Sequence, residues 1–171
     1  MKVDLTAMLK TFEDFMKVYQ RGDENKLYNG KNLLFYALAN VNAKERHKIA
    51  DFLLQTDIDP CGVNDDQYNL LHVLLVQHEQ DVPALVRTCS TLIERGVDIN
   101  QRDNNGQVPL QYIARLGKTD DELKELYDLW FSQKNVDVTG KDKRGFTPLK
   151  YAEGRPGREQ LVKRIREYAE K

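Results

Sequence analysis

The segment Gly145-Phe146-Thr147-Pro148-Leu149-Lys150-Tyr151-Ala152 decides the fold, because its pattern occurs four times in the chain. A glycine at its start is typical of a tight turn, and a Thr-Pro pair is typical of a helix start, with Thr as the cap and Pro in the first turn. The earlier copies are Gly30–Ala37, Gln67–Leu74 and Gly106–Ile113, and Val108-Pro109 in the third keeps the proline without the capping side chain. The shared leucines, spaced by 37, 39 and 39 residues, are Leu34, Leu71, Leu110 and Leu149.

A second set of residues repeats with the same period. Ile58-Asp59, Val97-Asp98 and Val136-Asp137 follow one another at two steps of 39 residues. Two independent series at one period indicate an array of supersecondary units, each too small to bury its apolar face alone. The local pattern predicts a turn, a short inner helix and a longer outer helix in each unit.

These residues resemble the ankyrin repeat. Gly145-Phe146-Thr147-Pro148-Leu149 resembles the Gly-x-Thr-Pro-Leu segment of that family, and Glu94–Asn100 continuing to Gly106 resembles its junction between repeats. His72 occupies the place of the family's motif histidine, which implies that its imidazole bridges backbone groups of a loop. The resemblance implies an all-α, ankyrin-repeat solenoid of about four helix-turn-helix repeats, with units longer than the family's usual length of about 33 residues.

The domain boundaries follow from this register. We expect an N-terminal helical cap over residues 1–28, which contains one amphipathic helix over residues 5–20 with Leu5, Leu9 and Met16 on its apolar stripe. We expect the repeats at about 29–66, 67–105, 106–144 and 145–171. A final helix from about Arg158 to Glu170 is charged on its outer faces, as a terminal repeat requires for solubility.

No catalytic, cofactor-binding or metal-binding constellation is predicted. Gly117-Lys118-Thr119 imitates the end of a phosphate-binding loop, but Tyr112 stands where that motif needs a glycine. Gly154-Arg155-Pro156-Gly157 is interpreted as a turn in preference to an anion site. The remaining candidates lack the spacing of metal ligands or of a nucleophile with its base, and they are His47, His72, His78, Cys61 and Cys89.

Tyrosine recurs at one position of the repeat. Tyr36, Tyr112 and Tyr151 are equivalent, and Val73 takes their place in the second unit. Packing against the neighbouring unit and partial exposure in a concave groove are both open interpretations, because Tyr is common at interfaces as well as in cores.

Charge separates along the chain although the total is close to zero. The 171 residues include 26 Lys and Arg against 27 Asp and Glu, a net charge of −1, which argues against a general nucleic-acid or membrane-surface binder. Residues 49–86 contain no Lys or Arg, whereas residues 141–171 carry an excess of Lys and Arg. The N-terminus lacks the apolar core of a signal peptide, so we expect a cytoplasmic monomer.

The sequence therefore predicts a non-enzymatic protein-binding module whose partner is another protein, either a basic one or a co-encoded toxin. The chain is similar to small stand-alone cytoplasmic ankyrin proteins of Gram-positive bacteria, some of which are thought to be toxin-immunity proteins. The alternative is a structural adaptor that bridges partners or self-associates. The expected contact residues are the turn tips, where Tyr68 and Phe146 are predicted as exposed aromatic anchors: Asn64, Asp65, Asp66, Gln67, Tyr68, Arg102, Asn104, Asn105, Gln107, Lys143, Arg144 and Phe146.

Overall fold

The chain folds entirely into helices, which confirms the all-α prediction. The computed structural model describes all 171 residues and contains no β-strand. None of its helices combines the length and the apolar character that crossing a bilayer requires. The elements are α1 (Val3–Leu9), α2 (Phe12–Val18), the 3₁₀ helix η1 (Asp23–Asn25), α3 (Leu33–Leu38), α4 (Ala43–Leu53), α5 (Leu70–Leu75), α6 (Val82–Glu94), α7 (Pro109–Ile113), α8 (Lys124–Phe131), α9 (Pro148–Glu153) and α10 (Glu159–Ala169).

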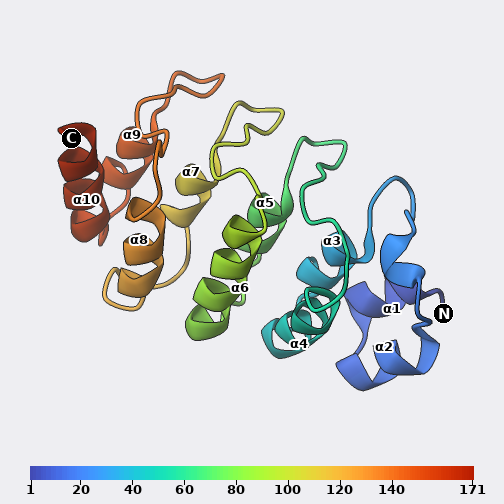
Figure 1. The fold of residues 1–171 in the computed structure, drawn as a ribbon. Coiled ribbons are helices and arrows are strands. Elements are labelled where there is room, and N and C mark those ends of the chain that lie inside the picture. The colour runs from blue at the N-terminus through green and yellow to red at the C-terminus, as the bar shows by residue number, and fades with distance from the viewer.

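The helices form two layers that follow chain order (Figure 1). The odd-numbered helices α1, α3, α5, α7 and α9 each contact the next odd-numbered helix, and the even-numbered helices contact one another in the same way. The loops that enter α5, α7 and α9 project from the same side of the molecule (Figure 1). Successive turns and short inner helices therefore lie beside one another and build a continuous face.

Side-chain caps explain where the inner helices begin. The Asn32 and Asn69 side chains accept hydrogen bonds from backbone N–H groups of the first turns of α3 and α5. Thr147 caps α9 by accepting from the Lys150 N–H, as predicted. Val108 offers no cap, and the Gln111 side chain instead accepts the Val108 N–H at 2.9 Å. Each inner helix thus satisfies donors that a helix start would otherwise leave free.

The prediction of one N-terminal helix over residues 5–20 is wrong. Lys10 is extended, and Thr11 caps a new helix by accepting the Asp14 N–H at 3.1 Å. The Glu45 carboxylate also accepts the Phe12 N–H at 2.7 Å, which fixes the second helix against α4. The break buries Phe15 but leaves Leu5, Leu9 and Met16 of the expected apolar stripe exposed.

The shared leucines show how burial depends on a following unit. Leu34, Leu71 and Leu110 are at most 1% exposed, whereas Leu149 is only partly buried. Leu149 belongs to α9, which has no later inner helix to cover it. The four leucines are equivalent in sequence, and the repeat pattern predicts equal burial; that prediction is wrong at the last position, because the last unit of a linear stack has no successor to cover it.

Polar ties join neighbouring turns. The Asn104 N–H donates to the Asp66 carbonyl, and one unit later the Lys143 N–H donates to the Asn105 carbonyl, both at 2.9 Å. His72 Nδ1 accepts the Asn69 N–H, and Nε2 donates to the Gln107 carbonyl of the next turn at 3.1 Å. This confirms the prediction that the His72 imidazole bridges backbone groups.

Two buried arginines satisfy the carbonyls of the loops between helices. Arg46 donates to the carbonyls of Asn40, Val41 and Glu79, and is fully buried. Arg158 donates to the carbonyls of Ala114, Leu116 and Lys118, and its nearest carboxylate oxygen, on Asp120, is 3.5 Å away. Buried carbonyls without such donors would each cost free energy, so these arginines hold the loops of adjacent units in place.

Truncation of the buried leucine row should destabilise the fold. We expect Leu110→Ala to lower the free energy of unfolding by about 2–5 kcal/mol, because the side chain is buried and neighbouring units cannot fully collapse into the cavity. Leu149→Ala removes the same atoms from a partly exposed site and should cost clearly less. Urea denaturation followed by circular dichroism measures both values, and equal losses would contradict the stacking argument.

A second buried histidine makes stability depend on pH. His47 is 3% exposed, its Nδ1 lies 2.8 Å from Thr88 Oγ1, and its Nε2 has no partner. Burial, helped by repulsion from Arg46, lowers the pKa of His47 from 6.5 to about 4. The unfolded chain therefore takes up a proton below pH 6.5 that the folded chain takes up only near pH 4.

The stability supplied by neutral His47 is fully present above pH 6.5 and is lost as the pH falls towards 4. We expect this histidine to account for a loss on the order of 3 kcal/mol across that window. The His47→Gln variant should lose less stability than the wild type over the same range, whereas His78→Gln, at an exposed site, should match the wild type. Identical urea-denaturation profiles for His47→Gln and the wild type would refute the assignment.

Candidate partner-binding groove

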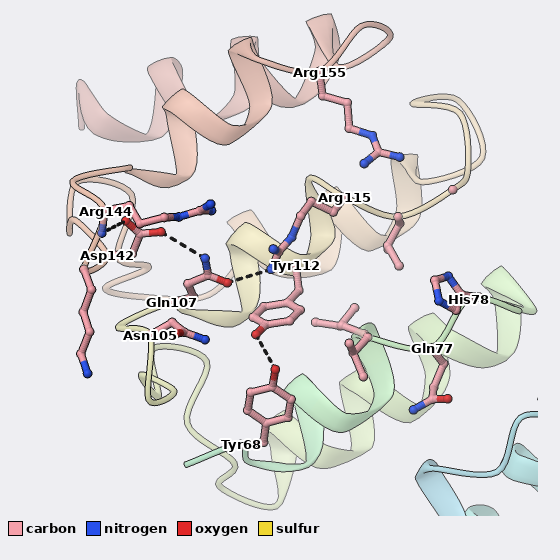
Figure 2. A pocket seen from close by; sticks show the side chains of 15 residues that line it. Tyr68, Gln77, His78, Asn105, Gln107, Tyr112, Arg115, Asp142, Arg144 and Arg155 are labelled. Atoms are coloured by element: carbon pink, nitrogen blue, oxygen red, sulfur yellow. Dashed lines mark hydrogen bonds between the residues drawn. The ribbon is translucent and has the colours of Figure 1, made fainter. Parts of the chain in front are cut away.

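One groove of about 760 Å³ crosses the face built by the inner helices and turns (Figure 2). It is formed by the C-terminal ends of α5 and α7, the turns that precede α7 and α9, and the loop after α9. The 15 residues that line it are Tyr68, Leu75, Val76, Gln77, His78, Asn105, Gln107, Tyr112, Arg115, Leu116, Gly117, Asp142, Lys143, Arg144 and Arg155.

The floor of the groove is a hydrogen-bonded network beneath Tyr112. The Tyr112 hydroxyl donates to Asp103 Oδ2 at 2.5 Å, and the Tyr68 hydroxyl, 2.9 Å from that of Tyr112, completes the chain. Asp103 Oδ1 accepts the backbone N–H groups of Asn105 and Gln107, which ties the turn to α7. Burial and the bond to Asp103 raise the pKa of Tyr112, so its hydroxyl stays protonated and keeps donating.

The next unit repeats this arrangement around Asp142. The Tyr151 hydroxyl and Gln107 Nε2 donate to Asp142 Oδ2 at 3.0 and 3.1 Å, and the Arg144 and Phe146 N–H groups donate to Oδ1. Burial would raise the pKa of Asp142, but these donors outweigh it and hold the pKa below its usual value. Asp142 is therefore a charged carboxylate whose two oxygens are already occupied.

The tyrosine series combines both interpretations left open by the sequence. Tyr36 and Tyr112 are at most 8% exposed, and their hydroxyl groups donate hydrogen bonds to the preceding turns. Tyr112 also lines the groove with its ring edge, while Tyr151 is half-buried behind Gln107. The recurring tyrosine thus anchors the turn to its own inner helix in the first, third and fourth units, while Val73 takes its place in the second.

Four cations give the groove its charge. Arg115, Lys143, Arg144 and Arg155 line it, and none lies within 4.0 Å of a carboxylate oxygen. The Arg115 guanidinium lies 4.3 Å from the centre of the Tyr112 ring, and its Nη2 donates to Gln107 Oε1 at 2.9 Å. Figure 2 shows Arg155 extending from the loop after α9 towards Arg115.

The predicted contact residues divide into those that line the groove and those that do not. Of the twelve, Tyr68, Asn105, Gln107, Lys143 and Arg144 lie together in the groove. The other seven lie outside the groove lining: Asn64, Asp65, Asp66, Gln67, Arg102, Asn104 and Phe146.

Three expectations about the turn tips need correction. Gln107 is 5% exposed, and its side-chain amide forms hydrogen bonds with Asp142, Tyr151 and Arg115. It is therefore not an exposed residue of the turn tip. Tyr68 is half-buried and stacked on the His72 ring, with centroids 5.2 Å apart. Phe146 is likewise half-buried, against Tyr151. Gln107 is held by the following turn, Tyr68 packs against both its own unit and Tyr112 of the next one, and Phe146 packs within its own unit.

Several groove residues were not anticipated. Arg115 follows Tyr112 by one helical turn, a spacing that could have indicated a shared face, and Arg155 belongs to the segment interpreted as a turn. Leu75, Gln77 and His78 come from the end of α5, and only the register of the repeats could have brought them beside α7.

The nucleophilic and metal-ligating side chains are dispersed. The structure has no group of three or more His, Cys, Asp or Glu side chains able to hold a metal ion. Burial raises the pKa of the Cys89 thiol to about 12, and burial together with Asp59 raises that of Cys61. Both thiols are therefore weak nucleophiles at neutral pH.

Comparison with known proteins gives a similar solved structure whose function is unknown. No family model matches the sequence, and no curated protein matches it. A crystal structure described as a functionally unknown protein from Leptotrichia buccalis C-1013-b is similar to this chain, with a TM-score of 0.86 and 27% sequence identity. The similarity covers 99% of this chain and 93% of that protein.

Proposed function

We propose that this chain is an ankyrin-type solenoid that binds another protein through the concave face of its inner helices and turns. The leucine period of 37 to 39 residues and the ordered contacts between successive helix pairs support this assignment. Repeat stacks of this kind present extended surfaces whose residues vary while the stacking residues are retained. We place the protein in the cytoplasm, as a monomer.

The observation that carries the proposal is the groove between α5, α7 and α9. It brings Tyr68, Tyr112 and Leu116 together with unpaired arginines, the residue types that most often dominate protein interfaces. The groove contains no nucleophile next to a base: His78 is its one imidazole, and both oxygens of Asp142 are already occupied. These features support binding over catalysis.

The narrower form of the proposal is an immunity role, in which the partner is a co-encoded toxin. The acidic stretch between Ile49 and Val86 supports a second contact with a basic surface of that partner. The alternative is an adaptor that bridges two partners, and the separation of an acidic middle from a basic groove is the observation that favours it. A toxin-like reading frame next to the gene would favour the immunity role.

The experiment is to capture the partner with the tagged full-length chain, purify it and measure binding by calorimetry. Asn105→Tyr with His78→Tyr fills the groove without adding formal charge and should weaken binding at least about tenfold, or roughly 1.4 kcal/mol. Gln55→Tyr with Ser132→Tyr places the same bulk on the outer layer and should leave affinity unchanged.

Two results would reject parts of this proposal. Equal affinity of the groove variant and the wild type would move the interface away from the concave face. Turnover of any small molecule by the purified chain, abolished by His78→Gln, would replace the binding role with an enzymatic one.

A further inference from the structure

The three arginines of the groove lack a carboxylate partner, which five of the other eight arginines of the chain have. Five arginines elsewhere form ion pairs with carboxylates: Arg87, Arg102, Arg158, Arg164 and Arg166. Arg115, Arg144 and Arg155 have no such pair although all three line one groove. Unpaired cations that line one groove favour an anionic ligand, because like charges held near one another repel until a counter-charge binds.

Arg115 is fixed in place before any ligand arrives. Its guanidinium face lies over Tyr112 at 4.3 Å and near Tyr151 at 5.2 Å from the ring centres. One of its amino groups donates to Gln107 Oε1, which is itself held by Asp142 and Tyr151 through the amide nitrogen. Because a guanidinium has five N–H donors, an edge of Arg115 stays available for a carboxylate.

Arg144 is held in a similar manner, near the same Tyr151 ring. Its guanidinium lies 5.2 Å from the centre of the Phe146 ring and donates to the Tyr151 hydroxyl. Arg155 has no side-chain hydrogen bond and reaches towards Arg115 (Figure 2). Two ordered guanidinium groups and one free one therefore face a common space.

The same groove has an apolar part next to the cations. Val76 is exposed there and Tyr68 is half-buried, above the buried side chains of Leu75, Leu116 and Tyr112. A ligand that fits both parts carries carboxylates close to an aliphatic or aromatic side chain, which describes a peptide better than a nucleic acid. The exposed Asp65 and Asp66 on the neighbouring turn, and a total charge of −1, would repel a long polyanion.

We propose that this groove binds an acidic peptide segment of the partner protein, with carboxylates between Arg115, Arg144 and Arg155 and an adjacent apolar side chain against Val76 and Tyr68. The proposal rests on the protein-binding function argued above and specifies the chemistry of the segment that docks. It complements the expectation of a basic partner surface at the acidic middle of the chain.

The test is a selection from a displayed library of random peptides on the full-length chain, followed by fluorescence anisotropy with the enriched peptides. We expect enrichment of Asp and Glu next to Leu, Phe or Tyr, and weaker binding as sodium chloride is raised. Replacing Asp by Asn and Glu by Gln in the same peptide should weaken binding by about tenfold or more.

Matched variants of the protein locate the site. Arg115→Gln with Arg144→Gln and Arg155→Gln should weaken the acidic peptide by at least about tenfold, whereas Lys10→Gln with Arg21→Gln and Lys134→Gln removes the same charge from exposed sites elsewhere and should stay within about twofold. The single variant Arg155→Gln removes an exposed side chain that forms no hydrogen bond or ion pair, so it should not affect folding. It should still weaken binding of the acidic peptide, which keeps the test valid if the triple variant is destabilised.

The outcomes separate the two proposals. Enriched peptides that lack acidic residues, or that bind the triple variant as tightly as the wild type, overturn the acidic-segment proposal and leave the protein-binding function standing. Failure to enrich any peptide, together with failure to capture a partner, overturns both. Preferential binding of a single-stranded RNA oligonucleotide, lost in the triple variant, would reassign the groove to nucleic acid.

Discussion

Successive helix pairs of this chain are joined by hydrogen bonds from the side chains of one inner helix to the backbone of the following turn. His72 Nε2 donates to the Gln107 carbonyl, and one unit later Gln111 Nε2 donates to the Phe146 carbonyl at 3.0 Å. A histidine and a glutamine thus make the same bond at equivalent positions, which shows that the requirement is for a donor of suitable reach. The stability of the whole chain is the sum of such hydrogen bonds and leucine contacts over all neighbouring units.

The ends of the stack show what happens without a successor. Lys150 occupies the position of His72 and Gln111 but has no following turn to bond, and it is exposed. Its α9 neighbour Leu149 is correspondingly only partly buried. At the other end α1 and α2 supply the missing contacts for α3 and α4, and Asn40 Nδ2 donates to the carbonyls of Ala7 and Lys10. Polar and charged residues at the last unit are thus a consequence of its place in the stack.

Sequence reasoning succeeded where a feature lies within one unit and failed where it needs two. The turn, the Thr147 cap and the leucine row are local, so their spacing predicted the helices. The break at Lys10 combines a local cap that sequence reasoning overlooked, Thr11 accepting the Asp14 N–H, with a distant one, Glu45 accepting the Phe12 N–H. Gln107 was expected at an exposed tip, but the turn that buries it belongs to the following unit. Arg115 and Arg155 share a groove although they are separated by one full repeat, so no local pattern joins them.

The residues that stack the units and the residues that shape the groove are partly the same. Gln107 accepts a bond from Arg115 at the groove while its amide nitrogen donates to Asp142 and Tyr151 of the next unit. The orientation of Arg115 is therefore set by a contact between successive units. Since buried networks of this kind have few alternative arrangements, the groove is pre-organised, and less conformational entropy is lost when a ligand binds. A change that loosens the stacking of α7 on α9 should accordingly alter the shape of the groove, and with it the proposed peptide binding, even when it replaces no residue that lines the groove.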